Sequence, residues 1–169
     1  GAQLGTAASP LITAPSGITA SATFTPTAAA YGAGDLMDVA KGLAFTYADG
    51  TVVPTGALIR ILTTVLKIDV TAVPSGQTSY TLHLYSVTPP SAQADNAVWT
   101  LASGDLASYA GSIALGTPAD LGAALYVKSQ YIDLDIKMAG TSLWGVLVTD
   151  AAHTATAVAR TVMLRGVVL

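Results

Sequence analysis

Short apolar segments separated by tight turns run along most of this chain, and they constrain its fold more than any other feature. The clearest is 130–138, QYIDLDIKM, in which apolar and polar side chains alternate. A period of two places alternate side chains on opposite faces of a strand. Similar segments recur at short intervals up to the last residue, with Gly, Pro or Asp between them. This spacing predicts about ten short antiparallel strands.

The predicted strands are the segments between these turn signals. They cover 19–25, 36–39, 43–47, 51–53, 57–70, 79–86, 109–115, 124–127, 130–138, 142–149 and 157–169. Asp49 and Gly50 form a two-residue hairpin signal between two of them. The apolar side chains of 57–70 change face midway, which indicates a bulge near Thr63 and Thr64 or burial on both faces. At most one helical turn, capped by Ser103, is expected.

The composition agrees with an all-β fold. All ten acidic residues are Asp, so the good helix former Glu is absent, while Thr, Gly and Val are plentiful. A chain of 169 residues is long enough for one domain with a full core. We therefore predict one antiparallel β-sandwich domain over 19–169. A jelly roll is favoured over an open sandwich because it protects its edges.

Residues 1–18 carry no charge and mix Gly, Pro, Ser and Thr with a few apolar side chains. Such a segment cannot bury a core of its own, so it is either a disordered tail or an extended arm lying on a partner. Leu4, Leu11 and Ile12 favour the extended arm.

Charge and hydropathy point to a surface that neighbours cover. Only 10% of residues are charged, the net charge is −3 and the mean hydropathy is +0.56. The seven basic residues are scattered along the sequence, so we expect no nucleic-acid partner. No apolar run is long enough for a membrane helix, so we expect no membrane partner. The chain has no cysteine. A weakly charged surface of small residues is typical of a subunit whose neighbours in an assembly cover it.

Three polar positions are candidates for chemistry. Asp133 and Asp135 lie two apart on one face of a strand, but Lys137 continues that face and neutralises it. His83 lies on the polar face of its strand without a second His or acidic residue in register. His153 lies in a small loop, DAAHTATA, and is expected to be exposed. We interpret all of these as structural and predict no catalytic, cofactor-binding or metal-binding residue, and no enzyme activity.

The aromatic residues are the stronger candidates for contacts. Trp144 lies within a predicted strand and is expected in the core. Trp99 lies inside the long connection YSVTPPSAQADNAVWTLASGD at 85–105. It either plugs one end of the sandwich or anchors a contact surface, where Trp and Tyr are common. Tyr31 and Tyr109 allow the same two interpretations.

Several phrases of the sequence resemble capsid decoration, or cement, proteins of tailed bacteriophages. They are AAAYGAGDLM at 28–37, YTLHLYSVTPPSAQADNAVWTLASGDLASYAGSIALG at 80–116 and AGTSLWGVLVTD at 139–150. The resemblance implies a jelly-roll subunit on the outer surface of the virion capsid. It further implies binding to the major capsid protein, as a dimer or trimer, without a cofactor.

The residues and the resemblance together give a contact hypothesis and one alternative. The contacts would come from the arm, with Leu4, Leu11 and Ile12, and from one end of the sandwich, with Tyr31, Trp99 and Tyr109. The alternative is a receptor- or carbohydrate-binding head of a phage tail or fibre. Such a site would use an exposed aromatic side chain beside polar ones, here Trp99 with Asp95 and Asn96.

Overall fold

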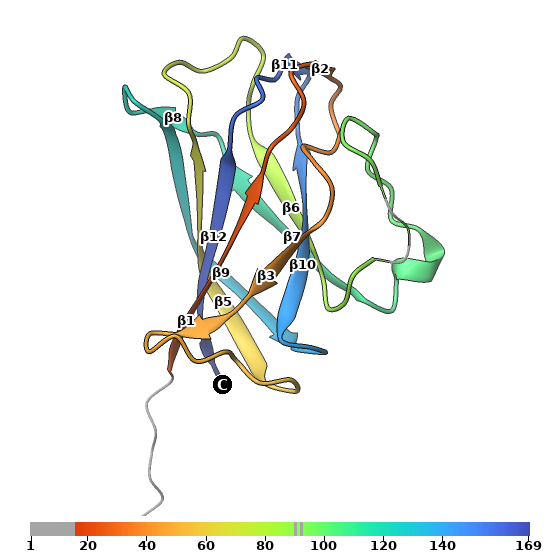
Figure 1. Cartoon of the computed structure of the whole chain (residues 1–169), viewed down its shortest axis with the longest axis vertical. Coiled ribbons are helices and arrows are strands. Elements are labelled where there is room, and N and C mark those ends of the chain that lie inside the picture. Colours follow the sequence, from red (N-terminus) through yellow and green to blue (C-terminus); the bar gives the residue numbers. More distant parts are fainter. Residues whose placement is uncertain (1–15, 90, 92) are drawn as a thin grey trace, which may run out of the picture.

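The computed structural model describes residues 16–89, 91 and 93–169, and it is a β-sandwich. Two antiparallel sheets face each other across the core (Figure 1). The prediction of an all-β antiparallel sandwich is confirmed. The predicted contacts at Leu4, Leu11 and Ile12 lie outside the described residues.

The larger sheet has six strands in the order β4-β1-β12-β5-β9-β8. Their bounds are β1 Gly17–Phe24, β4 Thr46–Tyr47, β5 Leu58–Ile68, β8 Ala119–Asp120, β9 Leu125–Lys137 and β12 Arg160–Val168. The C-terminal strand β12 pairs with β1 on one side and β5 on the other. The last strand is therefore held in the interior of this sheet, between two partners.

The smaller sheet has four strands in the order β3-β10-β6-β7. Their bounds are β3 Lys41–Ala44, β6 Tyr80–Tyr85, β7 Tyr109–Gly116 and β10 Ser142–Thr149. A short pair, β2 Ala30–Tyr31 with β11 His153–Thr154, lies at the end of the sandwich opposite the C-terminus (Figure 1). One 3-10 turn, η1 Ser103–Asp105, interrupts the long connection between β6 and β7.

The core forms where the inner faces of the two sheets meet. Strand β1 alternates exposed and buried residues along its whole length, as a strand with one solvated face should. The fully buried apolar side chains come from both sheets and include Phe24, Ile59, Ile61, Leu66, Leu82, Leu84, Leu143, Leu147, Val162 and Leu164. This packing of two apolar faces supplies the main drive to fold.

A bulge in β5 explains the change of face that the sequence showed. The pairing of β5 with both neighbours shifts at Leu62, between Ile61 and Thr63. On the neighbouring strand a Cβ on Gly166 would lie 2.1 Å from the Arg60 carbonyl oxygen, so only glycine fits there. The prediction of a bulge next to Thr63 is confirmed.

Several predicted boundaries were wrong. Strand β1 begins at Gly17, so Ile18, assigned to the arm, is buried in the sheet. The segments 124–127 and 130–138 form the single strand β9. Segment 36–39 makes one isolated bridge, from Leu36 to Val148, instead of a strand. At η1 the N-cap position belongs to Ala102, which provides no side-chain cap.

Candidate functional site

The long connection between β6 and β7 covers the outer face of the four-stranded sheet (Figure 1). We call its residues 86–108 the excursion, of which Pro90 and Ala92 are outside the described residues. Its backbone pairs with segment 34–36, where Asn96 donates to the Leu36 carbonyl at 2.9 Å and Trp99 to the Gly34 carbonyl at 2.9 Å. Leu36 is bridged in turn to β10. The excursion is thus attached through this segment to the sheet that it covers.

Four rings pack together at the excursion, and we call them the aromatic cluster. They are His83, Tyr85, Trp99 and Tyr109. The Trp99 ring stacks on His83 with centroids 3.6 Å apart and planes 15° apart. Its indole nitrogen donates a hydrogen bond to the Tyr85 hydroxyl at 3.2 Å. His83 Nδ1 and the Tyr109 hydroxyl share a hydrogen bond of 3.0 Å. Each ring therefore has both a packing partner and a polar partner.

Burial in the aromatic cluster changes the acid–base behaviour of two of its members. It lowers the pKa of His83 to about 4, since removal from water disfavours the charged imidazolium, and distant Asp150 only partly opposes the shift. It also raises the pKa of Tyr85, in spite of the hydrogen bond from Trp99. Both side chains are neutral near pH 7, so this cluster is an uncharged packing unit.

Trp99 thus packs within its own chain, but on a sheet face and not at an end of the sandwich. The side chain is half-buried, and its ring covers His83 of β6. Tyr109 lies beside it with centroids 6.3 Å apart. Of the two interpretations of Trp99, the plug at the end of the sandwich is wrong in its location, because the excursion folds back along the sheet. The contact-surface interpretation stays a prediction.

Tyr31 belongs to a second cluster, with Tyr80 and His153, at the end of the sandwich. Its hydroxyl donates to Asp95 of the excursion, 2.8 and 2.9 Å from the two carboxylate oxygens. Asp95 also accepts a hydrogen bond from the Thr27 backbone at 2.8 Å. The structure therefore brings Trp99 and Tyr109 together but places Tyr31 elsewhere, joined to them through Asp95 of the excursion and through segment 34–36.

His153 is buried, which corrects the expectation of an exposed loop residue. It pairs with Tyr31 in the β2–β11 ladder, and its ring packs edge-on against Tyr80 with centroids 6.1 Å apart. Burial lowers its pKa, a backbone hydrogen bond to Ala151 opposes the shift, and the charge of Arg160 adds to it. Arg160 is itself fully buried and donates to two backbone carbonyls. The contacts of His153 and Arg160 therefore connect the short β2–β11 pair and the loop before β12 to the core.

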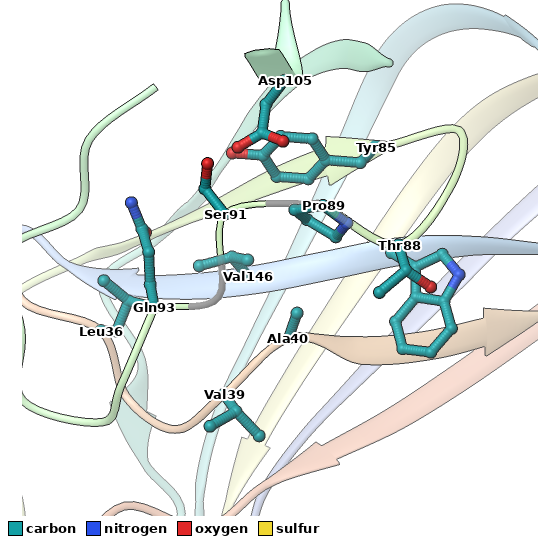
Figure 2. Close-up of a pocket in the computed structure, with 11 residues that line it drawn as sticks. Leu36, Val39, Ala40, Tyr85, Thr88, Pro89, Ser91, Gln93, Asp105 and Val146 are labelled. Atoms are coloured by element: carbon teal, nitrogen blue, oxygen red, sulfur yellow. The ribbon is translucent and has the colours of Figure 1, made fainter. Parts of the chain in front are cut away.

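A pocket of ≈ 200 Å³ opens between the excursion, segment 36–40 and strand β10 (Figure 2). Apolar side chains form most of its wall, including Leu36, Val39, Ala40, Pro89, Trp144 and Val146. Trp144 is half-buried on this outer face, so the prediction that it lies in the sandwich core is wrong. The cause is register, since its neighbours Leu143 and Gly145 occupy the inward positions.

Asp105 contributes the one acidic side chain of this pocket. It is only 2% exposed, and its Oδ1 has no hydrogen-bond partner among the residues that the structure describes. It is the last residue of η1 and lies next to Tyr85, whose pKa its charge helps to raise (Figure 2). Sequence reasoning missed this group, because an Asp after Ser and Gly in a loop indicates turn chemistry and no more.

The predicted carboxylate pair is an ordinary sheet surface. Arg60 on β5 lies 2.6 Å from an Asp135 oxygen and 3.1 Å from an Asp133 oxygen. The hydrogen bond to Arg60 lowers the pKa of Asp135. The two carboxylates are therefore paired with an arginine, and we do not interpret them as a metal-ion site.

Two searches for chemistry give negative results within the described part of the chain. Residues 16–89, 91 and 93–169 contain no group of three or more His, Cys, Asp or Glu side chains that could hold a metal ion. The same residues include no helix long and apolar enough to cross a membrane. The chain matches no family model and no curated protein.

Proposed function

We propose that this chain is a structural virion protein that decorates and stabilises the head of a tailed phage. It would bind the outer surface of the major capsid protein lattice, and the face covered by the excursion would be the contact surface. The observation that carries the proposal is the nature of this face, which exposes apolar side chains over a half-buried aromatic cluster. Val39, Val87, Val98 and Leu106 are 45%, 45%, 65% and 60% exposed there.

An apolar surface of this kind suits a contact between proteins. Charged residues are depleted and aromatic residues enriched at the centre of protein interfaces. Exposed apolar patches on soluble domains commonly mark such interfaces. The resemblance of 28–37, 80–116 and 139–150 to phage decoration proteins falls on this same face, because these segments contribute segment 34–37, the excursion and strand β10.

The pairing of the eight long strands supports a jelly roll, the fold expected for such a subunit. In chain order, the first strand pairs with the last, β1 with β12, and the second with the seventh, β3 with β10. The third pairs with the sixth, β5 with β9, and the fourth with the fifth, β6 with β7. This nesting is what a double-sheet roll of two Greek keys produces.

The mechanism of stabilisation would be multivalent contact. Each bound copy bridges neighbouring capsid subunits, and modest contacts repeated over a shell add up to a large resistance to rupture. A protein that binds the assembled lattice more tightly than free capsid subunits shifts the equilibrium toward that lattice. Contacts of the arm, with Leu4, Leu11 and Ile12, and a dimeric or trimeric state remain part of this proposal.

The carbohydrate-binding alternative is less well supported, since two of its three residues are engaged within the chain and only Asn96 is exposed among them. Both oxygens of Asp95 accept the hydroxyl proton of Tyr31, and Trp99 is stacked on His83. Neither is free to bind a sugar in this conformation. We therefore carry forward only the decoration role.

Co-sedimentation with undecorated phage heads tests the proposal. The expected result is saturable binding at hundreds of copies per head, on the order of one per few lattice subunits, as multivalent coverage requires. A variant lacking residues 2–15 tests the arm, and it should bind more weakly with an unchanged melting temperature. Binding at a dozen copies or fewer would indicate a vertex or tail position and contradict decoration.

A further inference from the structure

The edges of the two sheets differ in how they are protected against pairing with another strand. Strands β4 and β8 are two residues long, and β3 has four residues and carries Lys41. Beyond β8 the free side of β9 is charged and interrupted by a bulge at 131–133. Short length, charge and bulges all discourage edge-to-edge pairing. Strand β7 has eight residues with no charge and no proline, so it is the most open edge among the described residues.

Only the central part of β7 is available for a regular ladder. Residues 111–114 pair one for one with 81–84 of β6, and the register shifts on either side of them. No described strand pairs with β7 on the side away from β6. At its C-terminal end the Leu115 carbonyl already accepts a hydrogen bond of 2.9 Å from the Ser129 hydroxyl of β9. An added strand therefore has room for about four paired residues.

A seam of half-buried apolar side chains runs along this open edge. Val127, Ile132 and Leu134 of β9 pack against the core but are only partly buried. On the neighbouring β5 the inward-facing Ile61 is fully buried. The seam lies beside β7, since a Cβ on Gly111 would be 3.8 Å from a methyl carbon of Leu134. A strand added to β7 would cover the seam, so apolar burial would strengthen its backbone pairing.

Segment 11–14 of this chain, LITA, has the composition that such an added strand needs. It lies outside the described residues, is uncharged and contains the β-branched Ile12 and Thr13. Pro10 and Pro15 stand on its two sides. A proline lacks the N–H group that a ladder requires, so pairing would be confined to the residues between them. The segment therefore matches the open part of β7 in length.

Segment 11–14 cannot reach β7 of its own chain. Ile12 precedes Ser16 by four residues, so their Cα atoms are at most about 14 Å apart. Ser16 adjoins β1, and three strand spacings, about 14 Å, separate β1 from β9. Strand β7 belongs to the other sheet, and there β3, which packs against β1, is also three spacings from β7. A segment 11–14 paired with β7 must therefore come from another copy.

We propose that segment 11–14 of one copy pairs as an added strand with β7 of a second copy. The pairing is antiparallel, because antiparallel ladders are more stable per residue than parallel ones. Ile12 lies opposite Ile113 and faces the seam, while Thr13 lies opposite Ser112 on the outer face. The role of the exchanged arms on a phage head, where they would join neighbouring copies, rests on the proposed function. The pairing itself does not.

Mixed disulfides test the pairing in the full chain, which has no cysteine of its own. Thr13→Cys and Ser112→Cys are prepared as separate proteins, mixed and oxidised. Directly opposite residues of an antiparallel pair are close enough for a disulfide, so we expect a covalent dimer with one copy of each variant, identified by mass.

The control mixture combines Thr13→Cys with Ser21→Cys, whose position is exposed on β1. It should give at least about tenfold less mixed dimer, since no pairing holds these two positions together. Equal yields from the two mixtures would overturn the proposal.

Sedimentation velocity measures the self-association that the pairing would cause. Wild type should associate over about 10–100 µM, as expected for a small contact. Ile12→Lys places a charge against the apolar seam and should weaken association at least about tenfold. Gln3→Lys adds the same charge outside segment 11–14 and should associate like wild type. Both positions lie outside the described sandwich, so the fold should be unaffected. Wild type that stays monomeric, or association that Ile12→Lys leaves unchanged, would overturn the proposal.

Failure of the arm exchange and failure of the proposed function give different results. If wild type self-associates and forms the mixed disulfide but does not bind phage heads, the decoration role fails and the arm exchange stands. If wild type binds heads but gives no more mixed disulfide than the control, in solution or on heads, the arm exchange fails and the decoration role stands.

Discussion

The outer faces of the two sheets differ in how they meet water. The outer face of the six-stranded sheet, which we call the polar face, carries Arg60, Lys67, Lys128, Lys137 and Arg165, while Arg160 of β12 is buried. Leu58, Leu62, Tyr126 and Tyr131 are also exposed on its strands. Two of the basic residues pair with aspartates, at 2.6 Å for Arg60 with Asp135 and 2.6 Å for Lys67 with Asp69. The four-stranded sheet is instead covered by the excursion over four aromatic rings. Charged side chains on the first face are in contact with water. The second face is packed against the excursion, with a pocket between them.

This difference indicates which of the two faces is better suited to bind a partner protein. Exposed ion pairs contribute little to stability, and water solvates their charged groups well, so the charges of the polar face do not call for a partner. The covered face retains exposed apolar side chains, so a partner that covers them can improve its packing. The following predictions test whether the two faces respond as this comparison requires.

The largest effect is expected from Trp99→Ala on the covered face. It removes the stack on His83 and the donor to Tyr85, and because Trp99 is half-buried the cost should be about 2 kcal/mol of unfolding free energy. The melting temperature should fall by about 4–8 °C, with one cooperative transition retained. Differential scanning calorimetry measures both. A complete loss of the transition would show that the excursion is needed for the sandwich itself.

A pH dependence should follow from His83. Its pKa is about 4 in the folded chain and 6.5 in the unfolded reference, so between these values the unfolded chain binds more protons. The contribution is complete above pH 6.5 and lost as the pH falls toward 4, by about 1–2 kcal/mol after allowance for partial solvent screening.

His153 also has a lowered pKa, so a variant must separate the two residues. Urea denaturation of wild type and His83→Gln across pH 4–7 provides the comparison. The slope of unfolding free energy against pH should be clearly smaller in His83→Gln. Equal slopes would assign the effect to His153.

A smaller effect, of opposite sign, is expected on the polar face. Tyr131 is 93% exposed and has a φ of 62°, a region that costs a residue with a Cβ about 1–2 kcal/mol. Glycine avoids that cost but loses more entropy on folding, so Tyr131→Gly should stabilise the fold by about 0.5 kcal/mol. Tyr131→Ala keeps the strain and should give no gain. Chemical denaturation curves of the two variants would contradict the account if their order were reversed.

The smallest effect is expected from Arg60→Gln. Its ion pairs with Asp133 and Asp135 lie at the surface and are open to screening by salt. The denaturation midpoint should stay within experimental error of wild type at moderate salt. A clear loss of stability would show that the polar face depends on its charges more than the comparison allows.

The sequence predicted the six-stranded sheet better than the covered face. The reason is that strand patterns depend on neighbouring residues, whereas the covered face depends on contacts between residues far apart in the sequence. Alternation is local, so the C-terminal half of strand β9 and the bulge in β5 could be predicted from neighbouring residues. The cluster of His83 with Trp99 joins residues 16 apart in the sequence through a non-repetitive connection, and no periodicity encodes it. Trp144 was assigned to the wrong face because an aromatic residue in an apolar strand fits either side until the register is known.

The candidate site was less predictable than the fold. The choice of Trp99 and Tyr109 found two of the rings on the covered face from residue type alone. Asp105 could not be found, since its burial at 2% exposure is created only by three-dimensional packing. The sequence around a loop aspartate does not show whether its side chain is buried or exposed to solvent.

Hydroxyl-radical footprinting of the protein, free and bound to phage heads, tests the central claim most directly. The claim is that the covered face, and not the polar face, meets the capsid. We predict protection on binding at Val39, Val98, Leu106 and Trp144, with Tyr126 and Tyr131 labelled equally in both states. Protection of the two tyrosines with unchanged labelling of the covered face would contradict the account.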